Sequence, residues 1–313
     1  MIFRSLLLGA ALGAAVSAAD LRIGIIGTDT SHAGAFTSIL NDPKHPQWLP
    51  GARVVAAYKG GSKDLKESYT RVDKYAEDLR SKYGVEIVPD IKTLLSKVDA
   101  VLLESVDGRP HLEQARPVIE AGKPLFIDKP LSSTLKDARE IARLAKEKNV
   151  KWWSSSTLRF ADFMNDLKKP GITGVITWGP GPEEEHHQLD LAWYAVHPIE
   201  MLYTLMGTGC VEVTRTVTNG SDIITGKWKD GRTGVVKTLK PYGEFGAVAF
   251  YEKTILQSPD KPKYSYVPLV QNIIKAFQTG QVPVPNEETL EMFAFMDAAQ
   301  RSKEAGGKPM PVR

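Results

Sequence analysis

The chain of 313 residues contains a single cysteine, Cys210. One thiol cannot form an intramolecular disulfide or a zinc cluster, so the folded chain depends on its apolar core. The basic residues give a formal net charge of only +3 and form no run interleaved with aromatic residues, which argues against nucleic-acid binding. After residue 19, no apolar run is long enough to span a bilayer, which argues against stable membrane insertion.

The first 19 residues differ in kind from the rest. Arg4 supplies a positive start, residues 5–16 are almost wholly Leu, Ala and Gly, and Ser17-Ala18-Ala19 supplies small residues. This pattern predicts a signal peptide that is cleaved after Ala18 or Ala19, followed by export to the periplasm or the extracellular space. An uncleaved amino-terminal anchor is the alternative. We therefore leave residues 1–19 out of the predicted fold.

The remaining length is too great for one compact core, so two domains are expected. From residue 20 to residue 153, strand-like and helix-like runs alternate, which predicts a doubly wound parallel sheet. The expected strands cover residues 21–26, 53–58, 85–88, 100–104 and 125–127, with a last strand near Trp152; the expected helices begin near Thr30 and cover residues 68–83, 91–95, 109–121 and 134–148.

After Thr157 the pattern changes to short β-rich runs separated by turns. Residues 154–313 therefore read as an α+β domain with an open, mainly antiparallel sheet. Its expected strands cover residues 172–178, 211–218, 223–228, 235–239 and 247–251, and its expected helices residues 191–206, 268–277 and 287–303. We find no internal repeat and no low-complexity linker.

A short apolar run, Leu125 to Ile127, leads directly into Asp128-Lys129-Pro130. In open α/β sheets, ligands bind just beyond the carboxyl ends of the strands. Pro130 prevents the strand from continuing and favours an extended Lys129. The pattern thus predicts a lysine that faces a ligand crevice, and the alternative is a surface turn with a solvated lysine.

With these elements in place, the chain resembles the glucose–fructose oxidoreductase, inositol dehydrogenase and MocA (Gfo/Idh/MocA) family over essentially all of its mature length. Four segments carry the resemblance: Ile23 to Gly27; Glu120 to Pro124 leading into Asp128-Lys129-Pro130, where the family has Glu-Lys-Pro; His197-Pro198-Ile199-Glu200; and the ending from Thr279 to Pro309. The resemblance implies an amino-terminal Rossmann domain and an oxidoreductase that acts on a sugar or cyclitol, with NAD or NADP as cofactor. It also makes a homo-oligomer plausible through the open sheet of the second domain.

By the same resemblance, Lys129 and His197 are the catalytic candidates. Oxidation of a carbinol needs a group that takes the hydroxyl proton, and a lysine with an ordinary pKa of ~10.4 must fall by roughly two to three units to do so near neutrality. A histidine near ~6.5 already titrates in that range. The expected cofactor contacts are Gly27, Thr28, Thr30, Ser31, Lys59, Ser105, His111, Asp128 and Lys129.

The chain departs from the family pattern in the glycine fingerprint Gly-x-Gly-x-x-Gly. With the first glycine at Gly27, the second and third positions hold Asp29 and His32. A carboxylate at Asp29 would repel a pyrophosphate unless it caps the following helix or turns away. The end of the second strand has no acid for the ribose hydroxyls, and Lys59 with Ser62 could instead hold a 2′-phosphate; a solvated turn is the alternative.

Other positions leave alternatives open. Trp193 stands where the family often has an aspartate, and Asp190 lies one turn earlier. The run Glu183 to His187 suggests a metal site, but adjacent histidines face different ways, so we expect a solvated loop and no metal. Ser154 to Phe160 is either part of the ligand site or a polar hinge with Arg159 in an interdomain ion pair. Two functions remain: an NAD(P)-dependent oxidoreductase, or an exported protein that binds or cleaves carbohydrate and has lost dinucleotide chemistry.

Overall fold

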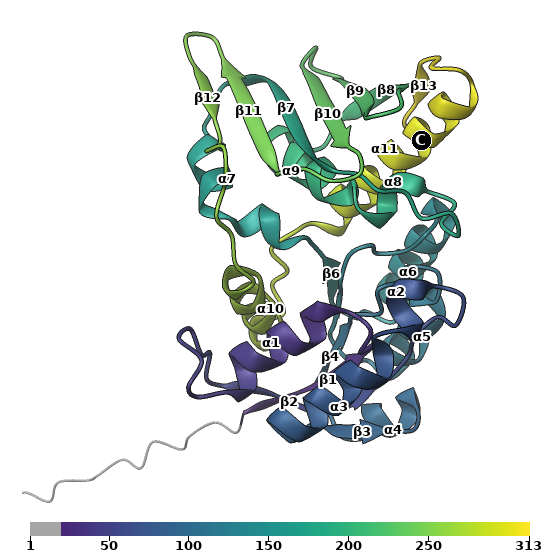
Figure 1. Cartoon of the computed structure of the whole chain (residues 1–313), viewed down its shortest axis with the longest axis vertical. Helices are drawn as coiled ribbons and strands as arrows, with labels where there is room; N and C mark the ends of the chain where they lie inside the picture. The colour runs from purple at the N-terminus through teal and green to yellow at the C-terminus, as the bar shows by residue number, and fades with distance from the viewer. Residues whose placement is uncertain (1–19) are drawn as a thin grey trace, which may run out of the picture.

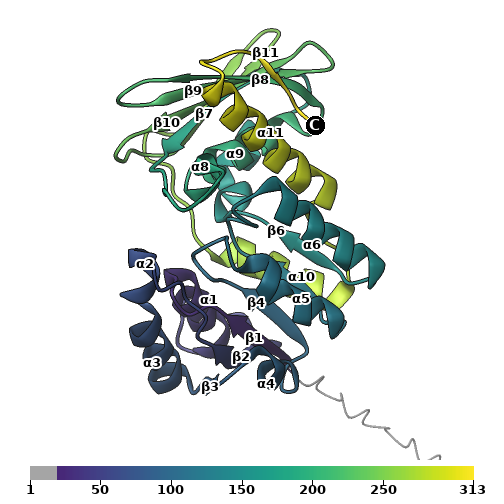
Figure 2. The ribbon, with the colours of Figure 1, turned by 90° about the vertical axis from the view of Figure 1, so that its right-hand side faces the viewer.

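The computed structural model describes residues 20–313, so the predicted signal segment, residues 1–19, lies outside the described part. Within residues 20–313, no helix combines the length and apolar character that a membrane crossing needs. Two sheets organise the molecule, one in each domain, and helices lie between them (Figures 1 and 2).

The first sheet confirms the predicted Rossmann-type fold. Its six strands are all parallel and lie in the order β3-β2-β1-β4-β5-β6. This is the arrangement in which a ligand crevice forms where the strand order reverses, beside β1 and β4. The strands are β1 (Leu21–Ile26), β2 (Ala52–Tyr58), β3 (Glu86–Val88), β4 (Ala100–Leu103), β5 (Leu125–Ile127) and β6 (Trp152–Ser154).

Helices cover both faces of this sheet because neighbouring residues of each strand point to opposite faces. Phe126 and Trp153 pack into one apolar cluster, and Leu125, Ile127 and Trp152 pack into the other. The first cluster includes α1 (Ser31–Asn41), α3 (Val72–Tyr83) and α10 (Val267–Thr279); the second includes α4 (Ile91–Leu95), α5 (His111–Glu120) and α6 (Leu135–Glu147).

The prediction of one continuous helix over residues 68–83 is wrong in one respect, because the segment forms two helices, α2 (Lys66–Tyr69) and α3. The side chains around the break contact the turn after β1. Ser68 Oγ donates to the Asp29 carboxylate, and Thr28 Oγ1 donates to the carbonyl of Val72. These tertiary hydrogen bonds compensate for the interruption, and no periodicity in the sequence reveals them.

The second sheet has seven strands in the order β12-β11-β7-β10-β9-β8-β13. Only β7 and β10 pair in parallel, so the expectation of a mainly antiparallel sheet is confirmed. The strands are β7 (Ile172–Pro180), β8 (Cys210–Val217), β9 (Asp222–Trp228), β10 (Thr233–Leu239), β11 (Gly246–Tyr251), β12 (Ile255–Gln257) and β13 (Met310–Pro311). Helices pack on one face only (Figure 2), and a homo-oligomer formed through the other face stays a prediction.

The remaining helices lie between this sheet and the first domain. They are the 3-10 turn η1 (Thr157–Phe160), α7 (Asp162–Leu167), α8 (Asp190–Trp193), α9 (Val196–Met206) and α11 (Asn286–Glu304). The predicted helix 191–206 is therefore two helices with a break at Tyr194 and Ala195. Helix α10 follows the second sheet in the sequence but packs beside α1 on the first sheet (Figure 1).

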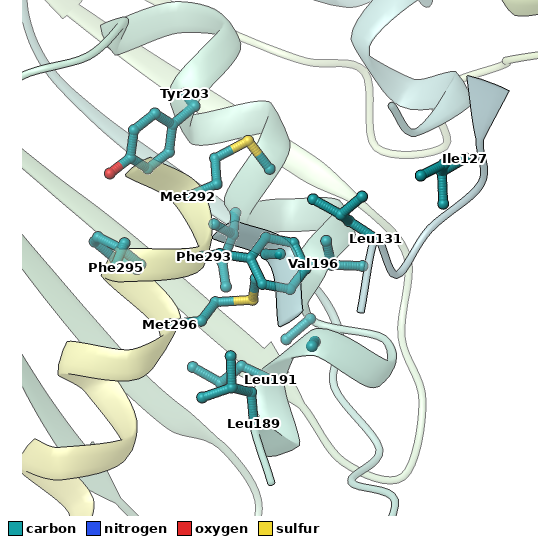
Figure 3. Packing of buried hydrophobic residues seen from close by; sticks show 14 of the residues in the cluster. Ile127, Leu131, Leu189, Leu191, Val196, Tyr203, Met292, Phe293, Phe295 and Met296 are labelled. Carbon is teal, nitrogen blue, oxygen red and sulfur yellow. The ribbon is translucent and has the colours of Figure 1, made fainter. Parts of the chain in front are cut away.

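One apolar cluster extends from the first domain into the second. Figure 3 shows Phe293 and Met296 of α11 beside Leu131, which follows β5, and Val196 of α9. Because side chains from both domains fill the same core, a change in this core affects the positions of β5 and α9 together.

Replacing Phe293 with alanine tests this shared core. The side chain is 1% exposed, so we expect F293A to lower the free energy of unfolding by about 3–5 kcal/mol through lost burial and a residual cavity. The urea unfolding midpoint of the purified protein measures the effect. Tyr242→Ala is the control, because Tyr242 is 64% exposed and its loss should change the midpoint little. Equal midpoints for the two variants would contradict the assignment of Phe293 to a shared core.

Candidate active site between the two domains

A cavity of about 490 Å³ lies where the carboxyl end of the first sheet meets α9. Residues from both domains line it, and they include three kinds of groups: basic side chains, carboxylates and a wall of aromatic rings. The lining residues that the argument below uses are Thr30, Ser31, His32, Arg71, Lys129, Tyr194, His197, Phe245, Tyr264 and Tyr266. Of the predicted contacts, the cavity brings together Thr30, Ser31, Lys129 and His197.

Lys129 follows β5 and faces this cavity. Its Nζ lies 5.8 Å from the centre of the Tyr194 ring, and no carboxylate of residues 20–313 forms a salt bridge with it. Burial lowers the pKa of Lys129, and the charge of Arg71 acts in the same direction against the opposing effect of Asp128. A lysine in this state is closer to the basicity that proton transfer near neutrality needs.

His197 lies in the first turn of α9 and is held by a hydrogen bond to Ser156. Its Nδ1 shares a hydrogen bond of 2.7 Å with Ser156 Oγ. Ser156 is fixed in turn because its backbone N–H donates to Glu200, one helical turn after His197. Burial, together with the charge of Lys129, holds the pKa of His197 well below its ordinary value, so the ring is neutral at pH 7.

The predicted hinge forms a buried ionic network. Arg159 donates to Glu200 at 2.6 Å and forms an ion pair with Glu288 of α11 at 2.7 Å. Ser155 also donates to Glu200, at 2.5 Å. Arg159 is thus in an ion pair, as one sequence alternative expected, but both partners lie in the second domain, so the pair is not interdomain. This network holds the α9 side of the cavity in place.

The turn after β1 keeps one feature of the glycine fingerprint. Gly27 has a φ of +93°, and a Cβ added there would lie 2.2 Å from the backbone nitrogen of Ser105. Only glycine fits such a site. Asp29 turns away from the cavity and is fully buried, accepting from Ser68 Oγ at 2.5 Å and from the Val106 N–H at 3.1 Å. Burial raises the pKa of Asp29 against the effect of these hydrogen bonds.

The amino terminus of α1 is the part of this turn that opens to the cavity. Thr30 caps the helix by accepting from the His32 N–H, and Thr30 and Ser31 both line the cavity, as does Arg71 of the neighbouring segment. Free N–H groups at a helix amino terminus favour an anionic group, and Arg71 adds a full positive charge. Arg71 was not among the sequence candidates, because it follows the unpredicted break between α2 and α3.

The other predicted cofactor contacts lie outside the cavity lining. Thr28 is buried and donates to Val72, and Lys59 forms an ion pair with Asp73 at 2.8 Å on the surface. His111 is fully buried, and its two ring nitrogens lie within hydrogen-bond distance of the carbonyls of Ser105 and Leu131. Ser105 Oγ donates to Gln114. Asp128 is also buried beneath the cavity floor, where it contacts His32.

An ionic cluster closes the space beyond the end of β2. Asp107 accepts from Ser62 Oγ at 2.6 Å, from Arg109 at 2.7 Å and from His187 Nε2 at 3.1 Å. Although burial opposes it, these donors hold the pKa of Asp107 far below its ordinary value. Arg109 also pairs with Asp64 at 2.8 Å. The two side chains that the sequence offered for a 2′-phosphate therefore both contact carboxylates: Ser62 contacts Asp107, and Lys59 contacts Asp73 on the surface.

In the loop from Glu183 to His187, which we expected to be solvated, Glu183, Glu185 and His186 are exposed, and Glu183 and Glu184 line the cavity. His187 is buried against Asp107 of the first domain, whereas His186 pairs with Glu184 at 2.5 Å. Asp190 forms ion pairs with Arg215 and Lys303. Residues 20–313 contain no group of three or more His, Cys, Asp or Glu arranged to hold a metal. A larger cavity of about 780 Å³, beside α6, is lined by none of the predicted site residues.

Comparisons with known proteins agree with this geometry. Residues 21–156 match the model of the Gfo/Idh/MocA family, described as "Oxidoreductase family, NAD-binding Rossmann fold". No curated protein matches the chain. Many solved structures match its fold, and all those named next are too distant in sequence to show more than the fold.

Three of these structures are inositol dehydrogenases. The myo-inositol 2-dehydrogenase of Lactobacillus plantarum is 16% identical with a TM-score of 0.75, covering 94% of this chain and 100% of its own. The myo-inositol dehydrogenase of Lactobacillus casei, solved with NAD(H) and myo-inositol, is 18% identical with a TM-score of 0.74, covering 94% and 97%. The scyllo-inositol dehydrogenase of the same organism is 14% identical with a TM-score of 0.73, covering 94% and 98%.

The residues of the cavity fit the nicotinamide and phosphate portions of such a cofactor. The turn at Gly27 is too tight for a Cβ, as is typical of the first glycine of the fingerprint. The amino terminus of α1 is open to the cavity, and the buried Asp29 does not face it. At the adenosine portion, the cluster around Asp107 already engages Ser62, the side chain that the sequence offered for a 2′-phosphate.

The lowered pKa of Lys129 predicts a pH-dependent effect on stability. Since the folded pKa lies below the unfolded value of ~10.4, the charged lysine destabilises the fold below that window, and the penalty disappears as pH rises through it. We therefore expect Lys129→Met to be more stable than the wild type near pH 8, with the difference shrinking toward pH 10.5. Thermal unfolding across this range measures it. Lys63→Met, at an exposed position, is the control, and a pH-independent difference for K129M would refute the prediction.

Proposed function

We propose that this chain, whose residues 21–156 match an NAD-binding oxidoreductase family, is an NAD-dependent oxidoreductase that acts on a CH–OH group of a sugar, a cyclitol or a related polyhydroxylated molecule. The cavity between the domains is the proposed reaction site. The observation that carries this proposal is the placement of Lys129 at the carboxyl end of β5, facing the same cavity as His197.

The two side chains differ in what they can do with a hydroxyl proton. Lys129 has no salt-bridge partner among residues 20–313, so its Nζ is available to a substrate oxygen. His197 is neutral and its Nδ1 is engaged by Ser156, which leaves Nε2 to face the ligand. A bound nicotinamide would supply the hydride acceptor, and the two side chains would hold and orient the hydroxyl whose proton is removed.

The rest of the cavity suits a polyhydroxylated ring. Tyr194, Phe245, Tyr264 and Tyr266 form apolar faces, and sites for small molecules typically combine such faces with a few polar groups that fix orientation. Burial raises the pKa of Tyr266 to about 12, so its phenol stays protonated and can donate a hydrogen bond. The similarity to inositol dehydrogenase structures supports this substrate class at the level of the fold.

A second candidate function is favoured by one specific observation. The cluster of Asp107, Ser62, Arg109 and His187 fills the space beyond β2 and ties the second domain to it. A protein that binds or cleaves carbohydrate without a dinucleotide has no need of that space. The cavity at Lys129 would then hold the carbohydrate alone.

The release of cofactor separates the two candidates. We expect the purified protein, once denatured, to release NAD(H) in stoichiometric amount, or else to bind added NAD⁺ with a measurable thermal shift. Absorbance, mass spectrometry and thermal unfolding measure these outcomes. Absence of both signals would favour the dinucleotide-free function.

The proposed oxidoreductase function also predicts that the protein oxidises a polyhydroxylated substrate. We expect reduction of NAD⁺ with at least one of myo-inositol, scyllo-inositol and glucose, followed at 340 nm. Lys129→Met should lower kcat by about 10²-fold or more, the range typical of a lost proton-transfer group. Lys63→Met is the matched control and should keep full activity. An active K129M would remove Lys129 from the mechanism.

A further inference from the structure

The two residues at which the chain departs from its family pattern beside the cavity meet in space. His32 occupies the third fingerprint position, in the first turn of α1, and Asp128 replaces the family's glutamate after β5. Although 96 residues separate them, His32 Nδ1 lies 2.5 Å from Asp128 Oδ2. The sequence alone does not show that these two residues are in contact. In the fold they form an imidazole–carboxylate pair.

We propose that His32 and Asp128 form a further acid–base pair of the active site, in which His32 contacts the substrate and Asp128 orients and stabilises its ring. This inference rests on the proposed function, because it assigns a proton-transfer role in that reaction.

The tautomer of His32 follows from its partner. Asp128 is 2% exposed and ionised, because the charges of His32 and Lys129 lower its pKa even though burial alone would raise it. A carboxylate only accepts hydrogen bonds, so His32 Nδ1–H is the donor. The other ring nitrogen, Nε2, hydrogen bonds with no residue within 20–313, and His32 lines the cavity with 12% of its side chain exposed.

Aromatic neighbours fix the ring plane. Phe36, one turn later in α1, stacks on His32 with a centroid distance of 5.5 Å, and Tyr266 at the start of α10 lies at 4.8 Å. The ring therefore has one hydrogen-bonded edge and two aromatic neighbours, and the residue lines the cavity. This is the arrangement that a histidine needs to exchange a proton with a ligand while it stays oriented.

Among the ionisable groups around the pair, Asp128 is the carboxylate that can stabilise a protonated His32. Glu104, at the end of β4, is fully buried with neither oxygen hydrogen bonded within residues 20–313, and burial with the charge of Asp128 raises its pKa well above the ordinary value. Lys129 follows Asp128, and His197 of α9 lines the same cavity, where burial and the charge of Lys129 lower its pKa.

The pair completes the proton balance of the proposed reaction. As the carbinol C–H bond gives its hydride to the cofactor, the O–H bond breaks, a carbonyl forms, and the proton passes to His32 Nε2. Asp128 stabilises the resulting imidazolium, and the proton then leaves to water. Lys129 donates a hydrogen bond to the same oxygen, so the two groups act on one hydroxyl from different elements.

Three variants test the pair in the full protein. His32→Asn keeps a donor for Asp128 but lacks the base, His32→Ala opens space for added imidazole, and Asp128→Asn removes the charge. The readouts are kcat against pH for the most active compound of the panel, the Kd for NAD⁺, and the thermal unfolding temperature. His45→Asn, a change outside this cavity, is the control.

We expect H32N to lower kcat by about 10²-fold or more, with the Kd for NAD⁺ and the unfolding temperature near the wild-type values. Imidazole should restore part of the activity of H32A. D128N should move the acid limb of the kcat profile to lower pH, because the imidazolium loses its stabilising charge.

An H32N variant that keeps kcat within threefold would overturn the acid–base role and leave the oxidoreductase intact. A loss of kcat that imidazole does not rescue, together with weakened NAD⁺ binding and a lowered unfolding temperature, would show a structural role instead. A wild type that neither binds NAD⁺ nor turns over would overturn the proposed function, and this inference with it.

Discussion

A buried carboxylate at the carboxyl end of β5 is the constraint on which the site depends. Asp128 is ionised with almost no access to water, and such a charge is tolerated only when nearby groups compensate for its lost solvation. His32 provides the hydrogen bond and Lys129 a second positive charge. The need to satisfy this one group therefore brings the first turn of α1 and the end of β5 to the floor of the same cavity.

Two further polar networks hold the second domain in place. Arg159 connects Glu200 of α9 with Glu288 of α11 within that domain, while His187 reaches the Asp107 loop of the first domain. Breaking a buried pair by removing one partner is strongly destabilising, because the other charge is left without compensation. These networks, with the apolar core around Phe293, fix the distance between Lys129 and the helix that carries His197.

The sequence predicted the fold well because strand and helix alternation is a local property, and the parallel sheet and the mainly antiparallel sheet follow from it. It failed where tertiary contacts replaced local ones. The break between α2 and α3 is stabilised by bonds from Thr28 and to Asp29, residues about forty positions away, and no periodicity encodes them. Lys129 and His197 were identified from motifs, but Lys59, His111 and Ser105 lie away from the cavity because each has a partner that the sequence does not reveal.

The sequence by itself determined the order of the elements, the lysine at the end of β5 and the loss of two fingerprint glycines, since these depend on residue type and spacing along the chain. Only the tertiary structure decided what the replacements do. Asp29 turns inward to Ser68 and Val106, whereas His32 turns toward Asp128 and the cavity. The physical reason is that a polar side chain near a sheet edge takes the orientation in which its charge and hydrogen bonds are satisfied, and the partners that satisfy it come from distant parts of the chain.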